Sequence, residues 1–240
     1  MSMEEWSRKL GPQEFGRLYG DILMQRQTHE KAEKVERFRH LNPFVKPGQI
    51  LFAGSSLMEQ FPIYELMLDL DLPYTIYNRG IGGYTTAEML GTMQECVYDL
   101  KPAYIFLNIG TNDMNGEDYV QEELMARYEA ILAGIREHLP EAEMYLMAYY
   151  PVNPEVGKGN PMAAHMLQYR TNARIREANA FVASYAERFD GMHYVDANEG
   201  LTDENGNLKA EFTIEGIHMY ANGYRVVLQN LIPVLQGLGK

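Results

Sequence analysis

Four short polar segments of the sequence contain the residue types that acyl transfer requires. A serine hydroxyl attacks an ester carbonyl once a base accepts its proton, and histidine is the usual base because its pKa lies near neutrality. A carboxylate then orients the imidazole, and amide N–H groups hold the oxyanion of the tetrahedral intermediate. The four segments are 54–56 (GSS), 80–83 (GIGG), 110–113 (GTND) and 215–218 (EGIH).

Short apolar runs alternate with longer helix-type patterns from residue 49 to the end of the chain. The runs expected to form buried strands are 50–53, 74–78, 104–109, 143–149 and 192–195. The segments expected to form helices are 86–100, 117–138, 163–189 and a last one that begins near residue 221. This alternation predicts a parallel sheet covered by helices on both faces. Because the carboxyl ends of parallel strands meet at one edge, the polar segments are expected to converge there.

The length, composition and net charge of the chain limit the classes of protein to which it can belong. A length of 240 residues, with 46% hydrophobic and 22% charged residues, is typical of one globular domain with a sizeable core. The formal net charge of −12 would repel phosphate backbones, so no nucleic-acid partner is expected. No apolar run approaches the ~18 residues that a spanning helix needs, so no membrane span is expected.

Cysteine usage and the amino-terminal residues bear on the compartment. Cys96 is the single cysteine, so no internal disulfide can form, and we interpret it as a small buried hydrophobe on a helix. The first ten residues, MSMEEWSRKL, contain acidic residues and no apolar region of the kind found in secretory signals. A cytoplasmic protein is therefore expected.

The amino-terminal part of the chain lies outside this alternation. Residues 12–40 read as one helix, in which Leu18 and Ile22 share an apolar face and the second half is densely charged. We expect two parts, a helical extension over 1–45 and a single domain over 46–240. The extension could pack on the domain or on a partner subunit, which makes a homodimer possible.

The four segments and their neighbours resemble, in this order, the sequence blocks of the SGNH (GDSL-type) serine esterases and acylhydrolases. The matching blocks are 54–57, 78–85, 110–113, and 215–218 followed by 221–224. The residue types alone do not indicate which serine of the first segment is the nucleophile. The resemblance puts Ser56 at that position. It puts Gly83 and Asn112 at the oxyanion-hole positions and His218 at the position of the base. Glu215, three residues before the histidine, stands at the position of the triad acid. GTND is the most specific of the four blocks.

The resemblance implies a fold and a mechanism. The fold would be a flavodoxin-like three-layer α/β/α sandwich with a five-stranded parallel sheet. The activity would be hydrolysis of a small-molecule ester through an acyl-enzyme, with the main-chain N–H of Ser56 as a further oxyanion donor. No metal and no organic cofactor is implied. Short acyl esters, acetylated sugars, lysophospholipids and thioesters are all compatible substrates.

This sequence departs from the family pattern at two positions. Ser55 stands before the nucleophile, where aspartate is usual. The acid is Glu215 rather than aspartate, and glutamate fills this role in other serine hydrolases. Asp196 and Asp203 are the alternative candidates for the acid. The side chains expected to line the substrate site are Leu57, Met58, Tyr84, Met114, Pro151 and Val152.

Two other functions compete with hydrolysis. A non-catalytic module that binds acetylated carbohydrate on the same fold would lack a nucleophile, a histidine or an oxyanion donor, and none of these residue types is missing. A nucleotide-binding protein would need a phosphate loop after the first strand, and GSSL is too short for one. The histidines show no metal-ligand spacing such as HExxH.

Overall fold

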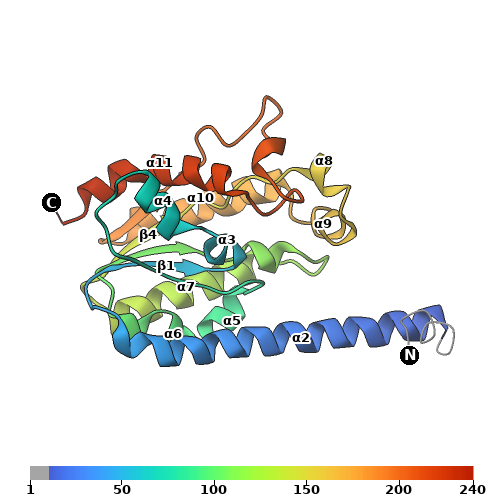
Figure 1. Ribbon diagram of the computed structural model, residues 1–240, viewed down its shortest axis with the longest axis horizontal. Coiled ribbons are helices and arrows are strands. Elements are labelled where there is room, and N and C mark those ends of the chain that lie inside the picture. The colour runs from blue at the N-terminus through green and yellow to red at the C-terminus, as the bar shows by residue number, and fades with distance from the viewer. Residues whose placement is uncertain (1–10, 240) are drawn as a thin grey trace.

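The computed structural model describes residues 11–239, and a five-stranded sheet lies at its centre (Figure 1). All neighbouring strands pair in parallel, in the order β2-β1-β3-β4-β5. The strands are β1 (Ile50–Gly54), β2 (Ile76–Gly80), β3 (Tyr104–Asn108), β4 (Glu143–Met147) and β5 (Met192–Val195). The predicted parallel sheet and the flavodoxin-like strand order are confirmed.

Helices cover both faces of the sheet. The longer ones after α2 (Pro12–Leu41) are α4 (Ile63–Asp69), α7 (Gln121–His138), α10 (Asn172–Arg188) and α11 (Ala221–Gly237). The short ones are α3 (Ser56–Glu59), α5 (Thr86–Leu90), α6 (Met93–Cys96), α8 (Pro154–Gly157) and α9 (Pro161–Met166). The 3-10 turns are η1 (Asn42–Phe44), η2 (Tyr98–Leu100), η3 (Thr111–Met114) and η4 (Ala210–Phe212).

The core consists of two apolar clusters, one on each side of the sheet. Alternate residues of a strand enter different clusters, as Leu51 and Phe52 of β1 do. Helices α5, α6, α7 and α10 build the first cluster with the end of α2, and α4 and α11 build the second. Since β1 is buried along its whole length, its apolar sequence is what a strand covered on both faces requires.

Strand order places the functional edge of the sheet. The chain passes from β1 to β2 on one side and then returns to β3 on the other side of β1. The connections that leave the carboxyl ends of β1 and β3 therefore run in opposite directions. The place between these two strand ends is a topological switch point, which is where open α/β sheets bind their ligands. Residues 55–56 follow β1 and residues 110–113 follow β3 at this place.

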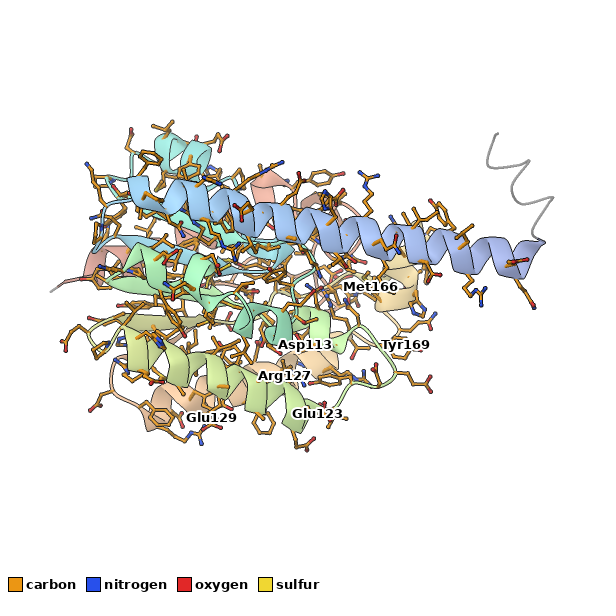
Figure 2. The ribbon with its side chains drawn as sticks, turned by 90° about the horizontal axis from the view of Figure 1, so that it is seen from below. Asp113, Glu123, Arg127, Glu129, Met166 and Tyr169 are labelled. Carbon is orange, nitrogen blue, oxygen red and sulfur yellow. The ribbon has the colours of Figure 1, made fainter. Side chains whose placement is uncertain are left out.

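The amino-terminal helix α2 (Pro12–Leu41) is attached to the domain by its second half only (Figures 1 and 2). Val35 is buried against the domain. Lys31 pairs with Glu88 of α5, and Arg39 pairs with Glu95 of α6. The first half extends past the sheet, with its exposed apolar side chains Leu18, Ile22, Leu23 and Met24. The division into an extension over 1–45 and a domain over 46–240 stays a prediction.

Two of the predicted helices are interrupted. The segment 86–100 forms α5, α6 and η2, with Gly91 as the residue that ends α5. The segment 163–189 forms α9 and α10, because Thr171 accepts a hydrogen bond from the N–H of Arg174 and starts a new helix. In both regions the apolar pattern predicts one continuous helix, and a local helix end divides it.

The described residues contain no helix that is both long and apolar enough to cross a membrane.

Candidate active site

Ser56 is the first residue of α3, and Ser55 alone separates it from the end of β1 at Gly54. The turn into α3 passes close to β3, where the N–H of Ser55 donates to the main-chain oxygen of Asn108 at 3.3 Å. A Cβ atom at Gly54 would overlap with this same oxygen, so glycine is required there. Ser55 occupies the capping position of α3, yet its buried hydroxyl has no hydrogen-bond partner among residues 11–239.

His218 links Ser56 to Glu215. Its Nε2 lies 2.9 Å from the Oγ of Ser56, and its Nδ1 lies 2.5 Å from Oε1 of Glu215. The main-chain N–H of His218 also donates to this Oε1 at 3.2 Å. With Nδ1–H directed at the carboxylate, Nε2 is the nitrogen left to accept the hydroxyl proton of Ser56.

A tight loop holds Glu215 and His218 in this geometry. Thr213 Oγ1 accepts the N–H of Gly216 at 2.8 Å and donates to the main-chain oxygen of His218 at 2.9 Å. Gly216 has a φ of 96° and packs so closely on Asn153 that a Cβ atom would overlap with the main-chain oxygen of Asn153. Glycine is therefore needed at the centre of the loop.

The carboxyl group of Glu215 is held in its ionised form. Burial acts to raise its pKa, but hydrogen bonds from His218 and the charge of the imidazolium outweigh burial, and the pKa is lowered overall. The alternative acids lie elsewhere: Asp196 accepts the N–H of Asn198, and Asp203 accepts the N–H groups of a turn at 3.0 Å or less. Neither makes a hydrogen bond to His218 within the described chain.

The predicted oxyanion donors come from three different segments. Gly83 has a φ of 74° in the turn that Tyr84 closes by donating to the oxygen of Ile81. The main-chain N–H groups of Ser56 and Gly83 donate to no other described residue. Nδ2 of Asn112 donates one hydrogen to the main-chain oxygen of Tyr84 at 2.8 Å, so its second hydrogen is available.

Charged side chains of α2 and α3 hold the main chain at Gly82 and Gly83. Glu59 of α3 accepts the N–H of Gly82 at 2.7 Å and pairs with Lys34 of α2. Lys31, also on α2, donates to the main-chain oxygen of Gly83 at 2.9 Å. The amino-terminal helix therefore contacts the predicted oxyanion loop directly. Sequence reasoning missed these residues because they pair across more than 20 positions.

Asp113, in the turn η3 after β3, contacts Thr86 and Arg127. Its carboxylate accepts the N–H of Thr86 at 3.0 Å and the Thr86 hydroxyl at 2.5 Å. Nη2 of Arg127 on α7 lies 3.4 Å from it, and Figure 2 shows the two side chains as neighbours. These contacts indicate a structural role for Asp113.

Arg170 is a further residue that sequence reasoning missed. It lies in the loop between α9 and α10, where its Nη2 donates to Oδ1 of Asn112 at 2.7 Å and its Nε donates to Oδ1 of Asn115 at 2.9 Å. The sequence signal was the Thr-Asn pair at 171–172, which caps α10 and leaves Arg170 in a loop. Because the apolar pattern predicts one unbroken helix over 163–189, a loop at Arg170 was not expected.

The side chains predicted to line the substrate site are all buried. Leu57 and Met58 pack in the cluster with α4 and α11, while Tyr84, Met114 and Val152 belong to the opposite cluster. Met58 and Met114 have no exposed surface, so a substrate would reach them only after a rearrangement. Pro151 lines a separate hollow beside α10 that also includes Asp196. Substrate contact by these six residues stays a prediction.

No cluster of three or more His, Cys, Asp or Glu side chains placed to hold a metal ion occurs between residues 11 and 239.

The fold and the site define the class of protein. A serine hydrogen-bonded to a histidine, at the switch point of a doubly wound sheet, is typical of a serine ester hydrolase. The sequence model of the GDSL-like Lipase/Acylhydrolase family matches residues 53–226, which is more than half of the chain. The chain therefore belongs to this family and is a carboxylic ester hydrolase.

Individual relatives agree with this assignment. The human platelet-activating factor acetylhydrolase IB subunit alpha2 is 24% identical over 194 residues, which are 80% of this chain and 78% of the relative. A candidate platelet activating factor of Streptococcus pneumonia has a similar structure, with a TM-score of 0.82 and 30% identity over 91% of this chain and 99% of that one. An acetylxylan esterase of Geobacillus stearothermophilus shares the fold, with a TM-score of 0.58 and 15% identity over 79% and 94% of the two chains.

Proposed function

We propose that this protein is an acetylesterase that works through an acyl-enzyme on Ser56, with His218 as base and Glu215 as the orienting acid. The observation that carries the proposal is the chain of contacts from Ser56 Oγ to His218 Nε2 at 2.9 Å and from His218 Nδ1 to Glu215 at 2.5 Å. A serine hydroxyl becomes an effective nucleophile only beside a base that is itself oriented by a third group.

The reaction has two halves. His218 takes the hydroxyl proton as Ser56 Oγ bonds to the ester carbonyl carbon, and the tetrahedral intermediate then expels the alcohol, which receives this proton. In the second half, His218 takes a proton from water as the water oxygen attacks the acyl group on Ser56. The carboxylic acid leaves and the proton returns to Ser56 Oγ.

Three donors stabilise the oxyanion in this proposal. They are the main-chain N–H groups of Ser56 and Gly83 and the free N–H of the Asn112 amide. Support comes from the absence of another acceptor for the two main-chain groups within residues 11–239 and from the single bond that Asn112 Nδ2 makes to Tyr84. Each such donor is worth about 2.7–4 kcal/mol in barrier height.

The acyl group that we propose is acetyl. Two of the proteins that resemble this chain, the human acetylhydrolase subunit and the acetylxylan esterase, carry names that specify an acetyl group on otherwise different molecules. The small acyl group is what they share, and the alcohol is where they differ. The alcohol half of the substrate of this chain is therefore best determined directly.

An acyl-chain series on the purified protein tests this proposal. We expect kcat/KM to be highest for p-nitrophenyl acetate and to fall through the butyrate and octanoate esters. Mass spectrometry of the protein quenched during acetate turnover should find one acetyl group on the peptide that contains Ser56. A preference for octanoate would contradict the acetylesterase assignment, and an acetyl group on another residue would contradict Ser56 as nucleophile.

We also propose that a second copy of the chain covers the first half of α2. Ile22 is 53% exposed and precedes Lys31 by nine residues, which at about 100° per residue puts it on the opposite side of the helix from the contact with Gly83. The domain of the same chain therefore cannot cover it. Light scattering is expected to give a dimer for the wild type and a monomer for Ile22→Glu, and a monomeric wild type would contradict the proposal.

The cytoplasmic location stays a prediction.

A further inference from the structure

Arg170 is a buried cation at the back of the proposed oxyanion hole. Its residue is only 3% exposed, and within the described chain no carboxylate lies close enough to form an ion pair with it. Its Nη2 donates to Oδ1 of Asn112 at 2.7 Å, and its Nε donates to Oδ1 of Asn115 at 2.9 Å. Met166, the last residue of α9, accepts the main-chain N–H of Arg170, and Figure 2 labels it together with Tyr169, which precedes Arg170.

Such a placement is costly for stability alone. An ionised side chain loses its hydration on burial, and a neutral amide oxygen compensates for this loss less well than a carboxylate does. Burial lowers the pKa of Arg170 to about 10, while the charges of Glu215 and Asp113 act to raise it. The guanidinium therefore remains charged at neutral pH. A neutral side chain of similar volume would fill the same space at a lower cost in desolvation.

Arg170 is the nearer of two donors that orient the amide of Asn112, at 2.7 Å from Oδ1, and Nδ2 of Asn115 donates to the same oxygen at 3.3 Å. The guanidinium requires an oxygen in front of it, so Oδ1 faces Arg170 and the NH₂ group faces the main-chain oxygen of Tyr84. A flipped amide would bring NH₂ against a cation and Oδ1 against a carbonyl oxygen, and both contacts are repulsive. A positive charge at Oδ1 also polarises the amide and makes its remaining N–H a stronger donor.

We propose that Arg170 is a positioning residue that acts through Asn112, holding and polarising its amide so that the free N–H donates to the oxyanion. This inference rests on the proposed function, because it assigns the amide of Asn112 to the transition state. Within the described chain the Arg170 side chain donates to Asn112 and Asn115, and no hydrogen bond joins it to Ser56. Its effect must therefore pass through Asn112 and must disappear when the amide is absent.

Arg170→Met tests the inference by removing the charge and the donors while keeping most of the volume. We expect kcat for p-nitrophenyl acetate to fall about 10- to 100-fold with KM unchanged, which is at most the loss for removing one oxyanion donor. Arg170→Lys keeps the charge but not the two-pronged geometry, and a smaller loss is expected. Unchanged kcat in Arg170→Met would overturn the inference.

A double-mutant cycle with Asn112→Ala separates positioning from a general structural role. In the Asn112→Ala background, Arg170→Met and Arg170→Lys should cause no further fall in kcat. The same fold-loss with and without Asn112 would mean that Arg170 acts by another route. If Arg170→Met does not fold, as judged by circular dichroism, the cycle with Arg170→Lys decides between the two roles.

Arg136→Met is the matched control. Arg136 also holds main-chain oxygens, of Pro140 and Asp190, but at the far end of the sheet, and its loss should lower the melting temperature without changing kcat. Failure of the inference is distinguishable from failure of the proposed function. Turnover that survives Ser56→Ala would remove the proposed function, whereas equal losses in the two backgrounds would remove only the role of Arg170.

Discussion

Lys31 of the amino-terminal helix donates a hydrogen bond of 2.9 Å to the main-chain oxygen of Gly83, which lies 52 residues further along the chain. The same Nζ lies 2.7 Å from Oε1 of Glu88 on α5. The predicted oxyanion loop is thus tied both to α2 and to the domain. The amino-terminal extension, which lies outside the residues matched by the family, takes part in shaping the site.

Lys31→Met should therefore affect activity as well as stability. Loss of the bond to Gly83 frees the oxyanion loop, and we expect kcat for p-nitrophenyl acetate to fall about tenfold, since small misplacements of reacting groups are costly. Unfolding in urea should show a loss of about 1 kcal/mol. Arg26→Ala is the control, because Arg26 pairs with Glu30 on the exposed part of α2. Equal kcat values for Lys31→Met and the wild type would contradict a role of α2 in the site.

Gly83→Ala should damage the same loop from within. The φ of 74° disfavours any side chain, and a Cβ atom would lie 2.5 Å from Nε2 of Gln27 on α2. We expect a large fall in kcat and only a small fall in the melting temperature, because the strain is local to the predicted donor. Gly206→Ala is the matched control, since Gly206 also has a positive φ but has no atom within 4 Å of its added Cβ. Similar kcat losses in the two variants would argue against Gly83 as a donor.

Glu215→Gln and Asp203→Asn decide which carboxylate serves His218. Glutamine keeps the shape of Glu215 but not its charge, so the tautomer and the imidazolium lose their partner, and kcat should fall about 100- to 10,000-fold. Asp203→Asn should leave kcat unchanged, because its oxygen serves the N–H groups of Asn205 and Asn207. A large loss in Asp203→Asn together with a small one in Glu215→Gln would reassign the acid.

The lowered pKa of Glu215 predicts a pH dependence of stability. A carboxyl group whose pKa is lower in the folded state than its ordinary value of 4.5 stabilises the fold above that value. This contribution is lost as the pH falls through the lowered pKa of the folded state. Urea unfolding of the wild type and Glu215→Gln should therefore differ most at neutral pH, and the difference should shrink below pH 4.5. A difference that grows in acid would contradict the lowered pKa.

The sequence predicted the fold well where local patterns decide it. The central strands β1, β3 and β4 are mainly apolar runs, and a parallel sheet needs such runs because both of its faces are covered. The sequence pattern failed where a single cap overrides a long apolar stripe, as Thr171 does before α10. The position of β2 was also shifted, since the strand runs over Ile76–Gly80 and includes Arg79 rather than the more apolar residues 74–75.

The candidate site was predictable to the extent that its members lie in short motifs. Glu215 and His218 share one loop, and the family resemblance put them at the acid and base positions, with Asp196 and Asp203 as alternative acids. Arg170 and Lys31 were missed because each acts across more than 50 residues, on a partner that only the tertiary fold supplies. The spacing of residues within a short motif does not indicate such long-range pairs. They can be identified only in the folded structure.

The nucleophile is tested most directly by comparing Ser56→Ala with Ser55→Ala in the hydrolysis of p-nitrophenyl acetate. Both variants remove one hydroxyl from the same turn, and the hydroxyl of Ser55 has no hydrogen-bond partner among the described residues. We expect Ser56→Ala to lose all measurable turnover with an unchanged circular dichroism spectrum, while Ser55→Ala remains active. Undiminished turnover in Ser56→Ala would contradict it.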